Sequence, residues 1–334
     1  MLDLYTSMVR IRRMEMAADA MYKQKQIRGF LHLCTGQEAV SVGIESALSK
    51  QDQVITAYRC HGFTHMRGAS VLSILSELAG RQGGVAKGKG GSMHMFAPKF
   101  FGGNGIVGAQ VPVGAGLAFA QKYKGEEAIT LALYGDGASN QGQVFEAYNM
   151  TKLWGLRCVF ICENNLYGMG TSAARSSALT EYHKRAGYIP GLKVNGMDVF
   201  AIKRGIEYAK QHVLEEKTPI VMELLTYRYG GHSMSDPGTT YRTREEIQRM
   251  RSEKDPITGL KQRMIDLGVV EGDGESLKQV EKEVRKQVDA DVEHALSQSE
   301  PAESELWTEI YVPGSEPKEL RGRISSESHR FVSS

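Results

Sequence analysis

The sequence has no charge excess and no long apolar run, and each absence excludes a class of protein. Its 41 basic and 39 acidic residues give a net charge of +2, whereas proteins that bind nucleic acid or a membrane surface usually carry a basic excess on one face. No apolar stretch approaches the roughly 18 residues that span a bilayer. Among 334 residues we therefore expect an ordinary globular chain with neither a nucleic acid nor a membrane as partner.

Cysteine is also scarce. The four cysteines, Cys34, Cys60, Cys158 and Cys162, form no CxxC pair, which argues against a zinc site or a redox dithiol. Cys158 and Cys162 lie in an apolar run and are expected to behave as small buried hydrophobic residues. Free, buried thiols indicate a reducing compartment.

The first 24 residues are amphipathic and carry three arginines, so they partly resemble a transit peptide. Transit peptides are poor in acidic residues, however, and Asp3, Glu15 and Asp19 interrupt this pattern. We expect a folded helix over residues 3–26, with any targeting segment absent from this chain. A second helix is expected over residues 36–48.

The middle of the chain alternates between apolar strands and helices. Strands are predicted at residues 128–135, 158–165 and 219–227, with helices at 141–154 and 199–212 between them. Apolar strands joined by helices are typical of a parallel sheet covered on both faces. The fold class is therefore α/β, with a parallel sheet flanked by helices.

The segments on either side of this region are less regular. Residues 83–116 are rich in glycine and are expected to be mostly loop. Thr243 and Glu246 match a capping box, which predicts a helix start, and charged helices are expected to continue to about Ser297. Residues 305–313 look strand-like.

No linker divides the chain into two independent domains. We expect one domain over residues 1–300 and a C-terminal extension over residues 301–334.

Two polar motifs follow neighbouring predicted strands. Gly135-Asp136-Gly137 comes directly after one strand, and Asn164-Asn165 ends the next. Because the carboxyl ends of parallel strands meet at one edge of a sheet, we expect Asp136 and Asn165 to share a ligand crevice. Their oxygens suit Mg²⁺ beside phosphate, and the helix starting near Gln141 points its positive end at an anion. A lone GDG would indicate only a tight turn, but GDG followed later by NN, each after a strand, resembles the motif of thiamine-diphosphate-binding enzymes.

Two competing phosphate motifs are weaker. Residues 83–89 resemble a Walker loop, but Gly90 replaces the Ser or Thr that should hold magnesium, and no strand precedes the loop. Residues 103–108 match GxGxxG, but no strand precedes them. The missing strand argues against a dinucleotide-binding fold. Both motifs are interpreted as parts of a glycine-rich cofactor wall.

Seven segments resemble the alpha subunits of mitochondrial pyruvate dehydrogenases, members of the thiamine-diphosphate-dependent 2-oxoacid dehydrogenases. The resemblance runs nearly unbroken over residues 1–270. It implies the diphosphate-binding half of a thiamine-diphosphate-binding fold, with extra N- and C-terminal helices. The segments are 32–39, 56–62, 86–95, 102–112, 134–143, 162–172 and 227–238.

The resemblance also implies roles for single residues. Asp136, Asn165 and the backbone carbonyl of Tyr167 are expected to bind Mg²⁺. His32 and His232 are expected to border the reacting centre as catalytic residues, while His61 and His94 are expected to be structural. The residues expected to contact thiamine diphosphate are Tyr58, Arg59, Gly105, Val107, Gly137, Ala138, Asn165, Gly168 and His232.

The implied activity is the oxidative decarboxylation of pyruvate and the reductive acetylation of a lipoyl group on an acyltransferase, in the mitochondrial matrix. No pyrimidine-binding domain is recognisable, so the chain is expected to act only with a separate beta subunit in an α2β2 assembly. The alternatives are a branched-chain 2-oxoacid or acetoin dehydrogenase alpha subunit, a non-catalytic phosphate-binding module, and a purely structural subunit.

A kinase and a phosphatase are further partners that the resemblance implies. Ser233 is expected to be the main phosphorylation site and Ser172 a second one, while Thr240 replaces the serine of a third. Both serines lie in expected regulatory loops, near residues 170–185 and 228–243. Glycine and proline around Ser233 predict that its loop is mobile and accessible.

Overall fold

A computed structural model describes residues 1–271, 274–324 and 327–330 of the chain. Five strands form one fully parallel sheet in the order β1-β2-β3-β7-β6. The predicted α/β class with a parallel sheet is confirmed. The strands of this sheet are β1 (Gln53–Ile55), β2 (Thr130–Gly135), β3 (Cys158–Asn164), β6 (Gly191–Asn195) and β7 (Ile220–Leu225).

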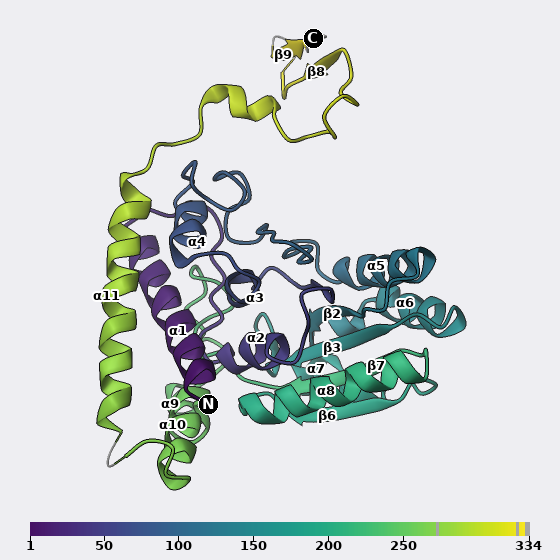
Figure 1. The fold of residues 1–334 in the computed structure, drawn as a ribbon, viewed down its shortest axis with the longest axis vertical. Coiled ribbons are helices and arrows are strands. Elements are labelled where there is room, and N and C mark those ends of the chain that lie inside the picture. The colour runs from purple at the N-terminus through teal and green to yellow at the C-terminus, as the bar shows by residue number, and fades with distance from the viewer. Residues whose placement is uncertain (272–273, 325–326, 331–334) are drawn as a thin grey trace.

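Helices flank the sheet and extend the fold at both ends of the chain (Figure 1). The α-helices are α1 (Leu2–Lys23), α2 (Glu38–Glu45), α3 (His61–Met66), α4 (Val71–Leu78), α5 (Gln110–Lys124), α6 (Gly142–Leu153), α7 (Ala173–Ser176), α8 (Val199–Glu215), α9 (Arg244–Lys254), α10 (Pro256–Asp266) and α11 (Glu275–Ser297). The short elements are 3-10 helices η1 (Ala138–Asn140), η2 (Tyr182–Lys184) and η3 (Glu303–Trp307), and hairpin strands β4 (Tyr167–Gly168), β5 (Thr171–Ser172), β8 (Glu319–Arg321) and β9 (Ser328–Arg330).

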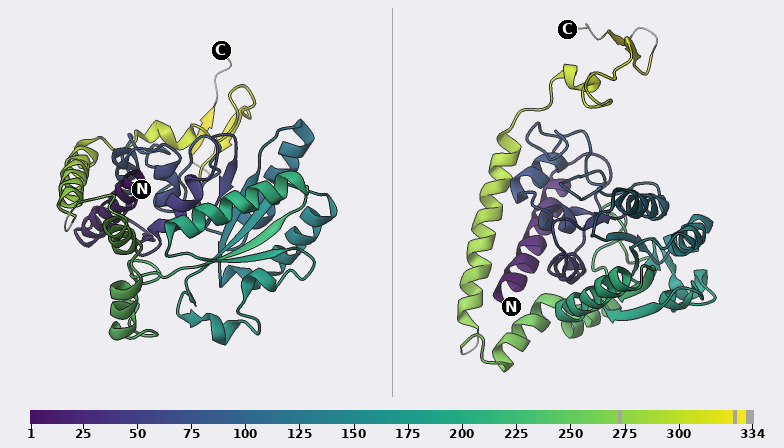
Figure 2. Two further views of the ribbon diagram at one scale, coloured as in Figure 1. Left: turned by 60° about the horizontal axis from the view of Figure 1, so that its bottom comes forward. Right: turned by 45° about the vertical axis from the view of Figure 1, so that its right-hand side comes forward.

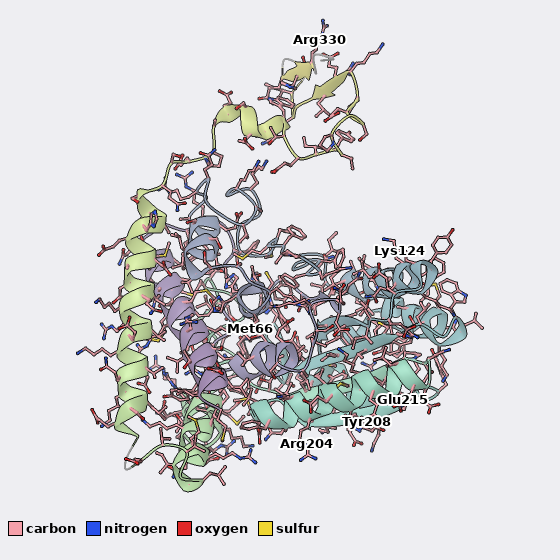
Figure 3. The ribbon with its side chains drawn as sticks, in the orientation of Figure 1. Met66, Lys124, Arg204, Tyr208, Glu215 and Arg330 are labelled. Carbon is pink, nitrogen blue, oxygen red and sulfur yellow. The ribbon has the colours of Figure 1, made fainter. Side chains whose placement is uncertain are left out.

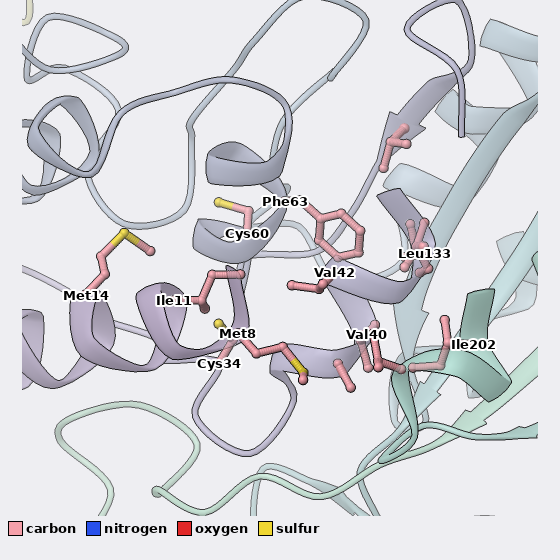
Figure 4. Packing of buried hydrophobic residues seen from close by; sticks show 14 of the residues in the cluster. Met8, Ile11, Met14, Cys34, Val40, Val42, Cys60, Phe63, Leu133 and Ile202 are labelled. Atoms are coloured by element: carbon pink, nitrogen blue, oxygen red, sulfur yellow. The ribbon is translucent and has the colours of Figure 1, made fainter. Parts of the chain in front are cut away.

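Strands β1, β2, β3 and β7 are buried on both faces, because alternate residues of each enter different apolar clusters, whereas the edge strand β6 is exposed on one face. Leu131 and Leu133 of β2 pack with α1, α2 and α8, whereas Ala132 and Tyr134 pack with α5 and α6. Figure 4 shows the first cluster, where Met8 and Ile11 of α1 lie close to the apolar side chains of α2. The continuous apolar strands seen in the sequence follow from this two-sided burial.

Helix α8 has one buried face and one exposed face. On α8, Ile202 and Ile206 are buried, whereas Arg204 and Tyr208 point away from the sheet (Figure 3). No helix within the described residues combines the length and the apolar character needed to cross a membrane.

The two ends of the chain pack together. Helix α11 runs alongside α1 (Figures 1 and 2), and the Tyr5 hydroxyl donates to Glu281 Oε1 at 2.5 Å. Beyond α11, η3 and the β8–β9 hairpin stand away from the sheet. The division into a domain over residues 1–300 and an extension stays a prediction.

The strand predicted at residues 305–313 is wrong: the segment contains no strand, and its start lies in η3. The glycine-rich segment is mostly loop, as predicted, and α5 begins at Gln110 near its end. The helix start predicted at Thr243 is confirmed, because Thr243 caps α9. The capping box itself is only half formed: the Thr243 hydroxyl accepts from Glu246 N at 3.1 Å, but the Glu246 carboxylate accepts instead from Tyr227 Oη at 2.8 Å.

Candidate active site

The two polar motifs meet at the carboxyl ends of β2 and β3, which pair with Gly135 opposite Glu163. Asp136 is 1% exposed, and its Oδ2 atom has no hydrogen-bond partner among the described residues. Burial raises the pKa of Asp136 to about 6, although Arg228 and the backbone N–H of Asn165 act to lower it. A buried carboxylate oxygen without a partner is costly, and a bound cation would remove that cost.

The side-chain amide of Asn165 is oriented by its neighbours. Its Nδ2 donates to Gln37 Oε1 at 3.1 Å, and its Oδ1 accepts weakly from Tyr167 N at 3.4 Å. Gln37 precedes α2, so the fold fixes this amide from a distant part of the chain. A carbonyl oxygen held in this way beside Asp136 makes a pair of hard oxygen donors, which suits Mg²⁺.

The backbones of Gly137 and Gly168 approach each other closely. A Cβ atom added to Gly137 would lie 3.1 Å from Gly168 Cα, so neither position has space for a larger residue. Next to Gly137, Ala138 begins η1, and Ser139 in that turn accepts a hydrogen bond from Arg185 Nη1 at 2.8 Å. Backbone this close to the crevice is suited to contact an anion directly.

Three rings form the adjoining wall. The centroids of His32 and Tyr58 are 4.5 Å apart, and that of His232 lies 5.3 Å from His32 and 5.4 Å from Tyr58. Burial and the nearby Arg59 lower the pKa of His32 to about 3 and that of His232 to about 4. Both imidazoles are therefore neutral near pH 7, and the Nδ1 atom of each has no partner within the described part of the chain.

Arg59 connects the segments that carry His32 and His232. It donates to the carbonyl oxygen of Leu33 and, at 3.0 Å, to that of His232. The guanidinium thus holds two distant segments together beside the crevice.

A cavity of 670 Å³ lies in front of the rings. Seven residues singled out in the sequence line it: His32, Tyr58, Gly105, Val107, His232, Ser233 and Thr240. The lining does not include Asp136, Gly137, Asn165 or Gly168. These residues lie together at the strand ends. Met169 and Gly170, which follow Gly168 in the chain, do line the cavity. The structure therefore groups the predicted residues in two adjoining sets.

The predicted accessibility of Ser233 is wrong. Its exposed fraction is 9%, it lines the cavity, and its Oγ lies 3.0 Å from Ser235 Oγ. The carboxylate of Asp236 fixes the loop by accepting from His232 N at 2.6 Å, Gly238 N at 2.8 Å and Tyr241 Oη at 2.5 Å. These bonds lower the pKa of Asp236, although burial raises it.

Arginines complete the support of this loop. Arg242 donates to the carbonyl oxygens of Arg228 and Gly230, both at 2.6 Å, and Arg228 donates to Tyr241 Oη at 2.9 Å. Sequence reasoning did not identify Asp236 or Gln37 as supports of the site. Both lie inside segments that carried the resemblance, but only the fold shows which group each one contacts.

The two histidines expected to be structural differ in surroundings. His61 is fully buried, and its Nδ1 lies 2.9 Å from Glu15 Oε2. His94 is exposed, and its ring lies near Gly105.

Comparison with known proteins shows similarity over almost the whole chain. Residues 6–304 match the family described as dehydrogenase E1 component. The chain is 63% identical to the pyruvate dehydrogenase E1 component subunit alpha, mitochondrial, of Chaetomium thermophilum, over 98% of this chain and 80% of that protein. The equivalent proteins of Saccharomyces cerevisiae and Homo sapiens (somatic form) are 61% and 56% identical, over 99% and 96% of this chain and 79% and 82% of theirs.

Proposed function

The chain belongs to the dehydrogenase E1 component family, and we propose that it is the alpha subunit of a thiamine-diphosphate-dependent pyruvate dehydrogenase. It acts as part of an enzyme with a beta subunit, as the subunit names of its relatives indicate. The observation that carries the proposal is the Asp136 carboxylate, whose Oδ2 has no partner among the described residues and which lies beside Asn165 where two parallel strands end.

The residues present fit thiamine diphosphate with Mg²⁺. We propose that Asp136, the Asn165 amide oxygen and the Tyr167 carbonyl hold the metal, because a lone buried carboxylate oxygen needs a cation. The close backbones of Gly137 and Gly168, together with Ala138, would contact the diphosphate. We assign Tyr58 and Arg59 to the same cofactor site, where Arg59 would supply positive charge toward the anion.

When bound, thiamine diphosphate supplies the electron sink that makes decarboxylation of a 2-oxoacid feasible. Gly105 and Val107 would face its ring end, because both line the cavity. His32 and His232 are proposed to be the catalytic residues at this cavity. As neutral imidazoles they can each donate or accept a proton or hydrogen bond, toward the 2-oxoacid or an incoming acyl acceptor.

The same proposal includes further partners. The enzyme assembles as α2β2, and a lipoyl-bearing acyltransferase accepts the acyl group. A kinase and a phosphatase act on Ser233 and Ser172. The relatives are named mitochondrial, and the matrix is the proposed compartment. The cavity position of Ser233 supports a regulatory role, because a phosphate there would enter the cavity itself.

A substrate panel tests the function. The chain is co-expressed with its beta subunit. Release of carbon dioxide from pyruvate and from a branched-chain 2-oxoacid, and cleavage of acetoin, are measured with and without Mg²⁺ and thiamine diphosphate. We expect pyruvate to be used with the highest kcat/KM, and only with the cofactor present. Preference for a branched-chain 2-oxoacid, or activity without thiamine diphosphate, would contradict the proposal.

A further inference from the structure

The glycine-rich loop that resembles a Walker motif surrounds a carboxylate of the chain itself. Glu77, at the end of α4, is fully buried. Its Oε2 accepts from Ala86 N and Gly88 N, both at 2.8 Å, and its Oε1 accepts from Gly90 N at 2.7 Å and Gly91 N at 3.0 Å. Four backbone N–H groups directed at one point form an anion-binding nest, and here the anion is Glu77.

The loop is shaped closely around this carboxylate. A Cβ atom on Gly84 would lie 2.3 Å from Glu77 Oε2, so a side chain at this position would displace the carboxylate. Lys87 adopts a left-handed conformation with φ 54°, which is unfavourable for a residue other than glycine. Since Glu77 binds the N–H groups on either side of Lys87, its carboxylate stabilises this backbone shape.

The residues that follow the nest form the wall of the cavity. Ser92 Oγ accepts from His32 N at 3.2 Å and lies 3.1 Å from His61 Nε2, while Met93 lines the cavity. Further along, a Cβ atom on Gly103 would lie 2.4 Å from the carbonyl oxygen of Met93, so this segment also packs directly against the 103–105 turn. The nest therefore fixes the segment of Ser92 and Met93. This segment in turn contacts the segment at His32 and the Gly103–Gly105 turn.

We propose that Glu77 is a positioning residue for the reaction: by filling the nest of residues 86–91, it holds Ser92 and Met93 in place against His32 and the Gly103–Gly105 turn. The loop consequently does not bind a phosphate in the folded chain. The inference rests on the proposed function, because it assigns the effect of Glu77 to the same cavity.

A second cavity gives a route to the nest. A space of 670 Å³ is lined by Glu77, Gly88 and Gly91 and, on its other side, by Glu305 and Leu306 of the C-terminal segment. A small anion that enters there could replace the carboxylate once it is removed. Formate is the matching probe, because it is a carboxylate without a side chain.

The test uses Glu77→Gln and Glu77→Ala in the enzyme reconstituted with its beta subunit. The control is Glu45→Gln, which removes another buried carboxylate, one paired with Arg67 at 2.7 Å. For Glu77→Gln we expect faster amide exchange across residues 86–95. We also expect a rise of roughly tenfold or more in KM for pyruvate or Kd for thiamine diphosphate, because loss of orientation acts on binding geometry. Formate should partly restore Glu77→Ala and leave the control unchanged.

Several outcomes would overturn the inference. Activity of Glu77→Gln that falls only with its folded fraction, as in Glu45→Gln, would show a role in stability alone. Normal KM and Kd despite faster exchange at residues 86–95 would show that the nest does not position the cavity. If Glu77→Gln does not fold, the absence of any formate effect on Glu77→Ala would decide against the proposal. The exchange and cofactor-binding measurements do not use pyruvate, so a wild-type enzyme inactive with pyruvate would contradict the proposed function separately.

Discussion

The surroundings of two buried aspartates distinguish a metal-binding carboxylate from a structural one. Asp52 accepts from Ser49 N at 2.7 Å, Ile129 N at 3.1 Å and Lys210 Nζ at 2.5 Å, so its charge is fully compensated. Asp136 is equally buried, but its Oδ2 has no partner among the described residues. A buried carboxylate oxygen without a partner does not stabilise the fold, so we infer that its use lies in binding.

The replacement Asp136→Asn should therefore abolish Mg²⁺-dependent binding of thiamine diphosphate while stabilising the cofactor-free chain. The folded pKa, about 6, lies above the ordinary 3.8, so ionisation of Asp136 destabilises the fold as pH rises through this window. A shift of about two units corresponds to at most about 3 kcal/mol of the free energy of unfolding above pH 6. Denaturant titration at pH 4 and pH 7.5 measures this, and calorimetry measures cofactor affinity.

The control for this experiment is Asp52→Asn, which should destabilise the chain at pH 7.5 because it leaves Lys210 without its charged partner. Unchanged cofactor affinity in Asp136→Asn would contradict the metal assignment.

At the scale of elements, the segment 228–243 is an ordered loop held by its own side chains. Asp236 accepts three hydrogen bonds within the loop, and Arg242 donates to two of its carbonyl oxygens. Arg228 and Arg242 are both buried and engaged, so neither can bind a new phosphate unless the loop rearranges. A charge introduced at Ser233 must therefore either enter the cavity or open the loop.

We expect Ser233→Glu to inactivate the reconstituted enzyme and to increase proteolytic cleavage within residues 228–243. The matched control is Thr239→Glu, because Thr239 lies in the same loop, is exposed and is not among the residues that line the cavity. Activity with a lipoyl-domain substrate and limited proteolysis measure the two effects. Full activity of Ser233→Glu, or of kinase-treated wild-type enzyme that carries phosphate on Ser233, would contradict a switch at this serine.

The elements that sequence predicted are those with long apolar patterns. Strands β2, β3 and β7 are buried on both faces and read as continuous apolar runs. Strand β1 has three residues and β6 contains a lysine and an asparagine, so neither carries such a signal. The 305–313 segment has β-forming residues but pairs with no strand within the part of the chain that the structure describes, and local propensity alone does not form a sheet.

The site was predictable to a similar extent. Asp136 and Asn165 follow recognisable strands, and parallel topology alone brings them together. The burial of Ser233 depends on packing against segments distant in the chain. The filled nest at Glu77 depends on how a glycine-rich loop 9 to 14 residues away folds back, and composition does not specify either contact.

For the whole molecule, apolar side chains surround the mouth of the cavity. Phe30, Ile106 and Met169 are 61%, 73% and 58% exposed, although Phe30 and Met169 line the cavity. Apolar side chains gathered at a site commonly mark a surface that a partner covers. Their position supports a beta subunit that closes the cavity.

We expect the purified chain alone to decarboxylate no pyruvate, and to gain activity when the beta subunit is added. The reason is that an open cavity neither excludes water nor supplies the second half of the cofactor site. Turnover is measured over a titration of beta subunit, with Arg204→Glu on the exposed face of α8 as a surface control that should not change the titration. Robust turnover by the isolated chain would refute the requirement for a partner.

The four buried cysteines can report on opening of the structure, because a buried thiol reacts only after it becomes exposed. Burial raises the pKa of all four thiols, so a thiol-specific reagent should label the native chain only as fast as the structure opens. Cys158 and Cys162 belong to the central strand β3 and should react only on global unfolding. Cys34 and Cys60 flank the segments behind His32 and Tyr58 and should react earlier if that wall opens locally. Two labelling rates, resolved by mass spectrometry, would therefore time the motion of the cavity wall separately from unfolding of the sheet, whereas immediate labelling of Cys158 would contradict the buried arrangement.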